Sequence, residues 1–403
     1  MSEEILHEGD YVELERRYAA HNYKPLDVVL CRGEGVWVHD VEGRRYLDCL
    51  SAYSAVNQGH GHPRILAALE EQARRLAITS RAFRNDRFGP LCRKLSRLFG
   101  YEQALLMNSG AEAVETAIKA ARRWAYAHRG VPEGEAEILA FEGNFHGRTT
   151  TIVGFSTHDN SRRGFGPFTP GFRVLPYGDA GAVAGAIGPR TAAVLVEPIQ
   201  GEAGVVIPPE GFLRELRALC DEHGVLLICD EIQSGLGRAG RWLAQEREGV
   251  RADGVTIGKA LSGGVYPVSA FLADERLMSV FDPGSHGSTF GGNPLACAVA
   301  EAALDVIEDE DLCARSERLG AAFLARLRDL RSPRVRALRG AGLWIGIQLE
   351  EREGGARRFS EALQGEGLLL KETRVDTLRF APPLVIGEDE LDMAYDALAS
   401  VLA

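Results

Sequence analysis

Two residues in the middle of the sequence have types and positions suited to catalysis, Lys259 and Asp230. Each follows a short apolar run, DGVTI before Gly258-Lys259 and VLLIC before Asp230, of the kind that forms a buried strand. A lysine amine desolvated at a strand end has a lowered pKa and can act as nucleophile and base. The chain has only five lysines against 41 arginines, so few other residues could take this role. The alternative for Lys259 is a solvated loop lysine.

A carboxylate after the VLLIC run would lie where water is scarce, and a buried carboxylate needs a cation nearby. A protonated pyridine nitrogen would satisfy Asp230 and would turn that ring into an electron sink. The other interpretation is an ordinary N-cap, because aspartate is common just before a helix. The residue alone leaves both interpretations open.

Two small-residue turns could hold an anion. The first, Asn108-Ser109-Gly110-Ala111-Glu112, opens a predicted helix, whose free N–H groups and dipole attract negative charge. The second, His286 to Asn293, is rich in glycine and carries hydroxyls suited to phosphate. Both turns are therefore candidates for a phosphate site.

Two further patterns are discounted. Residues 235–240, GLGRAG, match the dinucleotide fingerprint and would suggest a nucleotide-dependent oxidoreductase or a binding protein. However, four residues separate Asp230 from the first glycine, and no second strand ending in an acid follows at the expected distance. His60 and His62 have no apparent third ligand, so we predict no metal site.

The elements that must position these residues alternate between helix and strand. The apolar runs EILAFEG, TAAVLVEP, GVLLICDE and DGVTIG read as buried strands, and helices are predicted at 63–76, 111–128 and 212–223. This alternation predicts an α/β fold with a mostly parallel sheet covered by helices. Ligands of such sheets bind at the carboxyl ends of the strands, so we expect the residues that follow the strands to converge. These are residues 143–148, 197–202, 230–233 and 258–259.

The pattern changes after about residue 291. A helix at 294–308, strand-like residues 335–350, a helix near 357–366 and a closing helix at 388–402 predict a smaller α+β domain. Short extended runs within 26–50 predict an antiparallel element. We therefore expect an N-terminal segment, 1–50, that packs with the small domain, a large domain over 51–290, and a C-terminal domain over 291–403.

Composition excludes several classes of protein. The net charge is −11, which argues against nucleic acid as the main partner. No apolar run approaches the roughly 20 residues that a membrane-spanning helix needs. The acidic amino terminus lacks the features of a signal peptide, and the seven cysteines are scattered without a C-x-x-C pair. A cytoplasmic enzyme is the expectation.

Several strings, taken in order, resemble one family over almost the whole chain from about residue 20. They include SAYSAVNQGHGHP, GNFHGRT, VEPIQGEAGV, DEIQSGLGRAGRW, GKALSGGVYPVSA and HGSTFGGNPLA. Together they resemble the class III aminotransferases, which depend on pyridoxal 5′-phosphate (PLP). The resemblance implies the type I fold of PLP-dependent transferases, with a large PLP-binding domain and a smaller C-terminal domain.

The resemblance also implies roles for individual residues. Lys259 corresponds to the lysine that binds PLP through a Schiff base, and Asp230 to the partner of the pyridine nitrogen. Gln233 would donate to the ring hydroxyl and Phe145 would stack on the ring. Ser109, Gly110 and Ala111 would hold the phosphate, with Thr289 supplied by a neighbouring subunit, so a homodimer or a dimer of dimers is expected. In GNFHGRT, histidine follows Phe145 where animal members have tryptophan.

Within the family the strings resemble most the members that transfer the δ-amino group of ornithine to 2-oxoglutarate. Arg148 would bind the α-carboxylate of ornithine, and Arg379 that of 2-oxoglutarate. Glu202 would neutralise Arg379 while ornithine is bound. Tyr23 and Tyr53 would contact the carboxylate and α-amino group of ornithine, although either tyrosine could be a core aromatic. The alternatives are acetylornithine, 4-aminobutyrate, another ω-amino acid or LysW-linked lysine as the amino donor, and more distantly a racemase.

Overall fold

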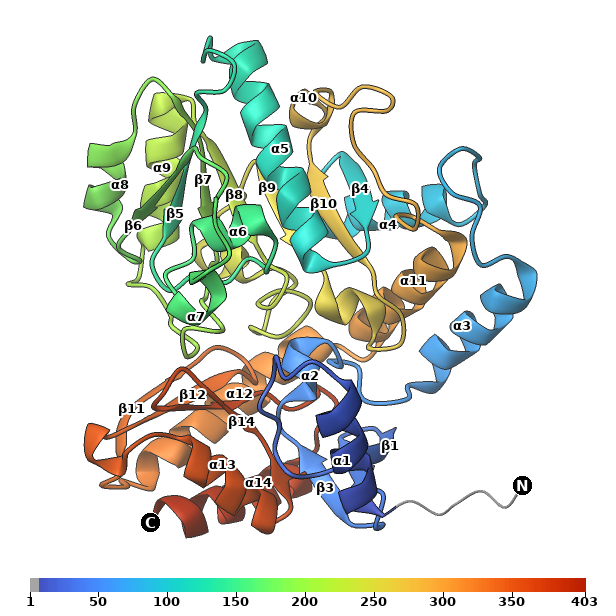
Figure 1. Cartoon of the computed structure of the whole chain (residues 1–403), viewed down its shortest axis with the longest axis vertical. Coiled ribbons are helices and arrows are strands. Elements are labelled where there is room, and N and C mark those ends of the chain that lie inside the picture. Colours follow the sequence, from blue (N-terminus) through green and yellow to red (C-terminus); the bar gives the residue numbers. More distant parts are fainter. Residues whose placement is uncertain (1–6) are drawn as a thin grey trace.

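The computed structural model describes residues 7–403, which form two lobes with different sheets (Figure 1). The larger lobe holds a seven-stranded sheet in the order β4-β10-β9-β8-β7-β5-β6. Neighbouring strands from β9 to β6 are parallel, whereas β10 runs antiparallel to both β9 and β4. The strands are β4 (Gln103–Met107), β5 (Glu137–Phe141), β6 (Phe172–Leu175), β7 (Thr191–Val196), β8 (Leu226–Asp230), β9 (Gly254–Ile257) and β10 (Ser269–Ala273).

The centre of this sheet is covered on both faces, because every residue of β7, β8, β9 and β10 is buried. Val194 and Val196 of β7 join the apolar cluster that contains helix α9 (Phe212–His223). The alternate residues, Ala193 and Leu195, join the cluster that contains α5 (Gly110–His128). The predicted α/β fold with a mostly parallel sheet is confirmed.

Other helices surround the sheet or connect its strands. They are α2 (Ser51–Ser54), α3 (Pro63–Arg75), α4 (Phe88–Phe99), α6 (Thr150–Gly154), α7 (Asp159–Arg162), α8 (Ala180–Ala186) and α10 (Glu275–Met278), with 3₁₀ turns η1 (Ala244–Glu248) and η2 (Lys259–Ser262). Helix α11 (Pro294–Asp309) contacts α3 and α4 of the larger lobe and leads into α12 (Leu312–Asp329) of the smaller one. Within residues 7–403, no helix has the length and apolar character to cross a membrane.

The smaller lobe contains two four-stranded sheets. One has the order β11-β12-β15-β14, and the other, β1-β2-β3-β13, joins the two ends of the chain. In the second sheet β3 pairs in parallel with β13, so blue and red segments lie side by side in Figure 1. The strands are β1 (Leu30–Glu34), β2 (Trp37–Asp40), β3 (Arg45–Asp48), β11 (Val335–Gly340), β12 (Ile345–Leu349), β13 (Leu368–Leu369), β14 (Lys371–Thr373) and β15 (Thr377–Phe380).

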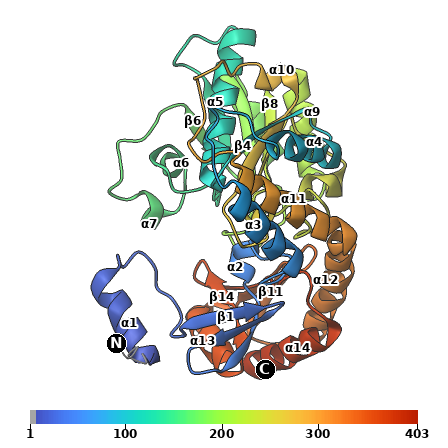
Figure 2. The same cartoon turned by 90° about the vertical axis from the view of Figure 1, so that its right-hand side faces the viewer.

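Three helices and a 3₁₀ turn complete the described chain: α1 (Glu8–Tyr18), η3 (Glu351–Glu353), α13 (Arg357–Gly365) and α14 (Glu388–Leu402). Helix α1 has no buried residue and stands away from the sheets (Figure 2). A segment between α1 and β1 returns from it to the body of the protein. This segment carries Tyr23, one of the predicted substrate residues.

Candidate active site

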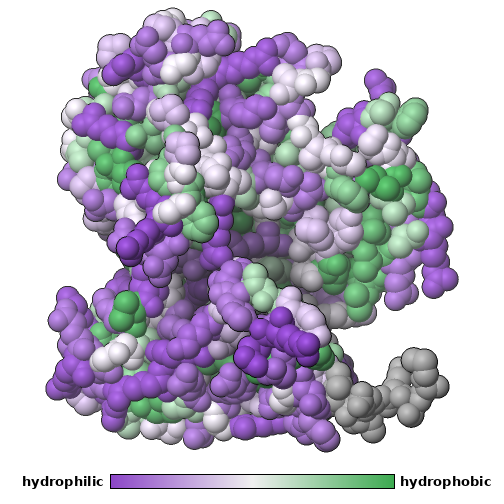
Figure 3. Space-filling view, viewed as in Figure 1, coloured by the Kyte–Doolittle hydropathy of each residue, from purple (hydrophilic) through white to green (hydrophobic). Residues whose placement is uncertain are grey.

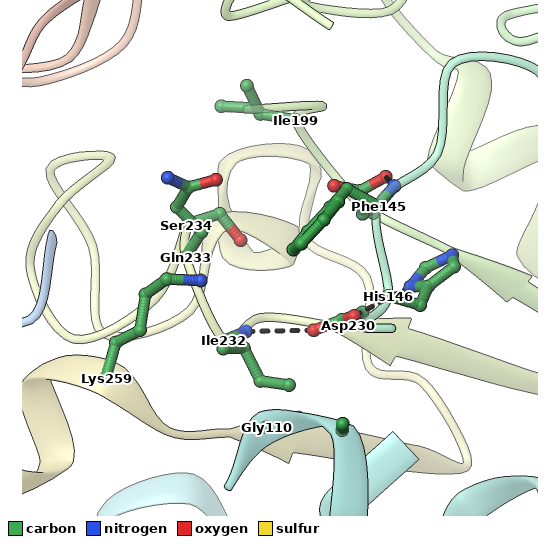
Figure 4. Close-up of a pocket in the computed structure, with 12 residues that line it drawn as sticks. Gly110, Phe145, His146, Ile199, Asp230, Ile232, Gln233, Ser234 and Lys259 are labelled. Carbon is green, nitrogen blue, oxygen red and sulfur yellow. Dashed lines mark hydrogen bonds and ion pairs between the residues drawn. The ribbon is translucent and has the colours of Figure 1, made fainter. Parts of the chain in front are cut away.

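The carboxyl ends of the central parallel strands open into a cavity of about 230 Å³ in the larger lobe. Lys259 follows β9 and Asp230 ends β8, and both line this cavity with Phe145 and Gln233 (Figure 4). Gly110 and Ala111, at the first turn of α5, line it as well. The expected convergence of residues that follow the strands is therefore confirmed.

Lys259 enters the cavity from a strained position, with φ of 45°. Burial lowers the pKa of its amine, although the nearby carboxylates of Glu202 and Asp230 oppose the shift. A lowered pKa increases the neutral fraction of the amine, which is the form that attacks a carbonyl or accepts a proton. The solvated-lysine interpretation is wrong for this residue.

Asp230 is 5% exposed and is held on both carboxylate oxygens. Its Oδ1 accepts hydrogen bonds from the backbone N–H of Ile232 and from the Thr256 hydroxyl, both at 3.1 Å. Its Oδ2 lies 2.7 Å from Nδ1 of His146. The residues after Asp230 form turns, so the helix N-cap interpretation does not apply.

His146 was not assigned a role from sequence, yet it is buried directly against Asp230. Burial opposes protonation of this imidazole, but the hydrogen bond and the charges of Asp230 and Glu197 outweigh it and raise its pKa. Glu197, which follows β7, also lines the cavity and accepts a hydrogen bond from the Phe145 N–H at 3.1 Å. Burial raises the pKa of Glu197 to about 8. Its position after a strand is the signal that could have found it.

The small-residue turn caps the N-terminus of α5. The Ser109 hydroxyl accepts from the Glu112 N–H at 3.3 Å, and Glu112 caps the turn in return. A Cβ on Gly110 would lie 2.9 Å from the Ile232 side chain, so a larger residue there would require Ile232 to shift. Thr289 lies on an exposed turn and does not line this cavity within the described chain.

These residues fit PLP chemically. The cavity offers a lysine amine of lowered pKa, a buried aspartate at its end and an aromatic face from Phe145. The N-terminus of α5 supplies free N–H groups and the positive end of a helix dipole, which suit a phosphate. Three cofactor features, a carbonyl, a ring nitrogen and a phosphate, thus each have a matching group.

A second cavity, of about 210 Å³, adjoins the first through Phe145. It is lined by all five predicted substrate residues, which come from both lobes: Tyr23, Tyr53, Arg148, Glu202 and Arg379. The Arg148 guanidinium donates to the Tyr23 hydroxyl at 3.1 Å. Arg379 lies over the Tyr53 ring, 4.9 Å from its centroid, and donates to Glu202 Oε1 at 2.5 Å.

The two patterns discounted from sequence do not line either of the two cavities. Residues 235–240 form turns that pack against the smaller lobe, with Arg238 fully buried. His60 lies 2.7 Å from Asp48, and His62 lies 3.0 Å from Glu310. Across residues 7–403 no group of three or more possible metal ligands gathers.

The chain is similar to known aminotransferases over nearly its full length. The family model described as Aminotransferase class-III matches residues 18–402. An ornithine aminotransferase of Bordetella pertussis is 58% identical over 390 residues, covering 97% of this chain and 95% of the relative. That of Brevibacillus brevis is 55% identical over 391 residues, 97% of each chain.

Comparison with solved structures shows the same similarity. The ornithine aminotransferase from Toxoplasma gondii superposes with a TM-score of 0.97 at 44% identity, covering 99% of this chain and 95% of that one. An acetylornithine aminotransferase from Elizabethkingia anophelis gives a TM-score of 0.90 at 46% identity, covering 98% and 99%. With matches that span both lobes and both cavities, the chain belongs to the class III aminotransferases, whose cofactor is PLP.

Proposed function

We propose that this enzyme transfers the δ-amino group of L-ornithine to 2-oxoglutarate. The products would be glutamate and glutamate-5-semialdehyde, which cyclises to pyrroline-5-carboxylate. The observation that carries the proposal is the ion pair between Arg379 and Glu202 inside the second cavity. The relatives named ornithine aminotransferase support the same substrate.

The ion pair suits an enzyme that handles two differently charged substrates in one pocket. Ornithine carries its α-carboxylate far from the reacting δ-amino group, within reach of Arg148 and Tyr23 at the exposed side of the cavity. Arg379 then has no substrate carboxylate, and Glu202 neutralises it. When 2-oxoglutarate enters, Glu202 releases Arg379 so that it can bind the α-carboxylate through a two-point contact.

The residues of the first cavity would carry out the proton transfers. Bound PLP supplies an electrophilic carbon and a ring that accepts electrons from the substrate. The Lys259 amine takes the proton from the reacting carbon of the substrate and later returns one. Asp230 would hold the proton on the ring nitrogen, Gln233 would donate to the ring hydroxyl, and Phe145 would stack on the ring. Ser109, Gly110 and Ala111 would bind the phosphate.

A homodimer is part of the proposal, because Thr289 would complete the phosphate site of a second copy. Exposed apolar side chains near this turn and after α3 support it, among them Phe290 and Phe83 at 51% and 70% exposure. Figure 3 shows apolar residues gathered on the side of the molecule where α3 and α4 lie. We also propose a cytoplasmic enzyme built of segments 1–50, 51–290 and 291–403.

Acetylornithine is the second candidate donor, because a solved acetylornithine aminotransferase is 46% identical to this chain. The test compares kcat/KM for ornithine, acetylornithine and 4-aminobutyrate, with 2-oxoglutarate as acceptor. We expect the protein with PLP to absorb visible light, to lose that absorbance on addition of ornithine, and to prefer ornithine over the other donors by more than about tenfold. A preference for acetylornithine or 4-aminobutyrate would refute the proposed donor.

A further inference from the structure

The short segment α2, which carries Tyr53, is a turn with a strained backbone. Four consecutive residues that are not glycine, Ser51 to Ser54, have φ of 45°, 47°, 61° and 73°. Left-handed backbone costs such residues about 1–2 kcal/mol each, and glycine normally occupies these positions. Strain of this kind persists only where surrounding contacts enforce it, and it concentrates at functional sites. Here the turn brings Tyr53 against Arg379.

Contacts from two sides hold this turn. On one side, Asp48 Oδ1 accepts from the N–H groups of Leu50 and Ser51, at 2.8 and 2.9 Å. On the other, the fully buried Ser51 hydroxyl donates to the carbonyl oxygen of Ala381 at 2.7 Å. Ala381 comes two residues after Arg379 in the chain, so this bond joins the turn to the strand end that carries Arg379.

The Arg238 side chain supports the same place from the larger lobe. It is fully buried, and it forms no ion pair within the part of the chain that the structure describes. Its Nη2 donates to the Ser51 hydroxyl at 2.9 Å and to Asn57 Oδ1 at 2.6 Å. Its Nη1 donates to the carbonyl oxygens of Leu343 and Pro382, both at 2.8 Å. One guanidinium thus connects the turn to two segments of the smaller lobe.

We propose that Arg238 and Ser51 are positioning residues that set Tyr53 against Arg379, and that they thereby determine how tightly the pocket binds a substrate carboxylate. The inference rests on the proposed function, which places substrate carboxylates beside Arg379. Arg238 hydrogen-bonds the Ser51 hydroxyl, and that hydroxyl holds the Ala381 carbonyl beside the Arg379 strand. The Ala381 N–H also donates to the Cys49 carbonyl oxygen at 2.8 Å, so two hydrogen bonds join the chain before Tyr53 to the strand end that carries Arg379. Of these two bonds, the one through the Ser51 hydroxyl is the one that Arg238 contacts.

A purely structural role makes a different prediction. If Arg238 only fastens the two lobes, any equally buried bond between the same segments should matter as much to the pocket. Ser316 provides that comparison. Its hydroxyl is fully buried, donates to the Arg238 carbonyl at 3.1 Å and accepts from the Leu343 N–H at 3.0 Å. Ser316 has no hydrogen bond to the turn within residues 7–403.

The test compares Ser51→Ala with Ser316→Ala in the enzyme with its cofactor bound. Glutarate, a dicarboxylate that cannot react, serves as the probe, and calorimetry gives its Kd. Thermal midpoints and the absorbance of the bound cofactor are measured on the same samples. We expect Ser51→Ala to raise the glutarate Kd by about tenfold, because it leaves the buried Ala381 carbonyl and one nitrogen of Arg238 without this hydrogen-bond partner. Ser316→Ala should leave the Kd unchanged at a comparable loss of thermal stability.

Arg238→Lys is an independent test. Lysine keeps the charge but lacks the planar guanidinium, which donates to the turn through one nitrogen and to the smaller lobe through the other. The substitution should raise the glutarate Kd and the KM for 2-oxoglutarate while kcat changes much less. Equal shifts of Kd in the two serine variants, or no shift in Ser51→Ala and Arg238→Lys, would overturn the proposal. A wild-type enzyme that binds glutarate but does not react with ornithine would instead contradict the proposed donor. The comparison of the glutarate Kd between the two serine variants would still hold.

Discussion

Replacing Glu202 by alanine tests how the pocket accommodates two substrates. Arg379 is 1% exposed and donates to Glu202 Oε1 at 2.5 Å, whereas the Glu202 side chain is 29% exposed. Burial acts to raise the pKa of Glu202, but the charge and hydrogen bond of Arg379 outweigh it, and the pKa is lowered. Glu202 is therefore ionised at neutral pH. Glu202→Ala leaves Arg379 as a buried cation without its counter-charge.

The size of the effect follows from the burial of the pair. Removing one partner of a buried ion pair costs about 3–5 kcal/mol, and the partial exposure of Glu202 favours the lower end. The wild-type enzyme breaks this pair only when a substrate carboxylate displaces Glu202, so in Glu202→Ala about 3 kcal/mol corresponds to roughly a 10²-fold rise of kcat/KM for glutamate as amino donor. Ornithine brings no carboxylate to Arg379, so its kcat/KM should change much less. The ornithine-to-glutamate ratio should fall by about two orders of magnitude.

Stopped-flow measurement of the two half-reactions gives this ratio without interference between the substrates. Glu202→Gln is the matched control, since it keeps the shape and one acceptor oxygen while removing the charge. It should give a ratio between those of the wild type and the alanine variant. If the Ala variant binds cofactor normally and keeps the wild-type ratio, Glu202 does not neutralise Arg379 during the ornithine half-reaction, and our explanation of the dual specificity is wrong.

Two further predictions concern the strained turn and the buried histidine. Ala52 is exposed with φ of 47°, so Ala52→Gly should raise the free energy of unfolding by about 1 kcal/mol, while the β-branched Ala52→Val should lower it. Denaturant titration of both variants decides this, and the opposite order would contradict the strain. The raised pKa of His146 means that its contribution to stability is complete below its unfolded pKa of about 6.5 and is lost as pH rises through the folded value. The stability difference between wild type and His146→Asn should therefore shrink from acid to alkaline pH, and a difference independent of pH would show that His146 stays neutral.

Helices with clear end signals were predictable from sequence. The helix expected at 294–308 is observed at Pro294–Asp309, with Pro294 in the first turn and the Asn293 side chain accepting from the Ala296 N–H. The helix expected at 111–128 begins one residue earlier, at Gly110, behind the Ser109 cap. Sheet order was not predictable, because an apolar run does not indicate its neighbour. The antiparallel β10 and the β3–β13 pair depend on contacts between distant segments.

The site was predictable to a similar extent. A position after a buried strand indicated Lys259 and Asp230, because parallel strands end at one edge of the sheet. The same signal applied to Glu197, to which we assigned no role from sequence. Arg238 could not be found this way. It stands in a run of glycines that resembles a nucleotide-binding motif, and its partners are carbonyl and side-chain oxygens far away in the sequence.

Asp230 and Glu197 are two buried carboxyl groups at the ends of neighbouring strands, and their hydrogen-bond partners differ. Three side-chain or backbone groups, from His146, Ile232 and Thr256, contact the oxygens of Asp230. Among the described residues the Glu197 carboxyl group accepts one hydrogen bond, from the Phe145 N–H, and burial raises its pKa to about 8. At neutral pH Glu197 is thus mostly protonated, and it adds little negative charge to the cavity. A neutral Glu197 would leave Asp230 as the carboxylate at this end of the cavity, which fits the role that we propose for Asp230 as the partner of the cofactor's ring nitrogen.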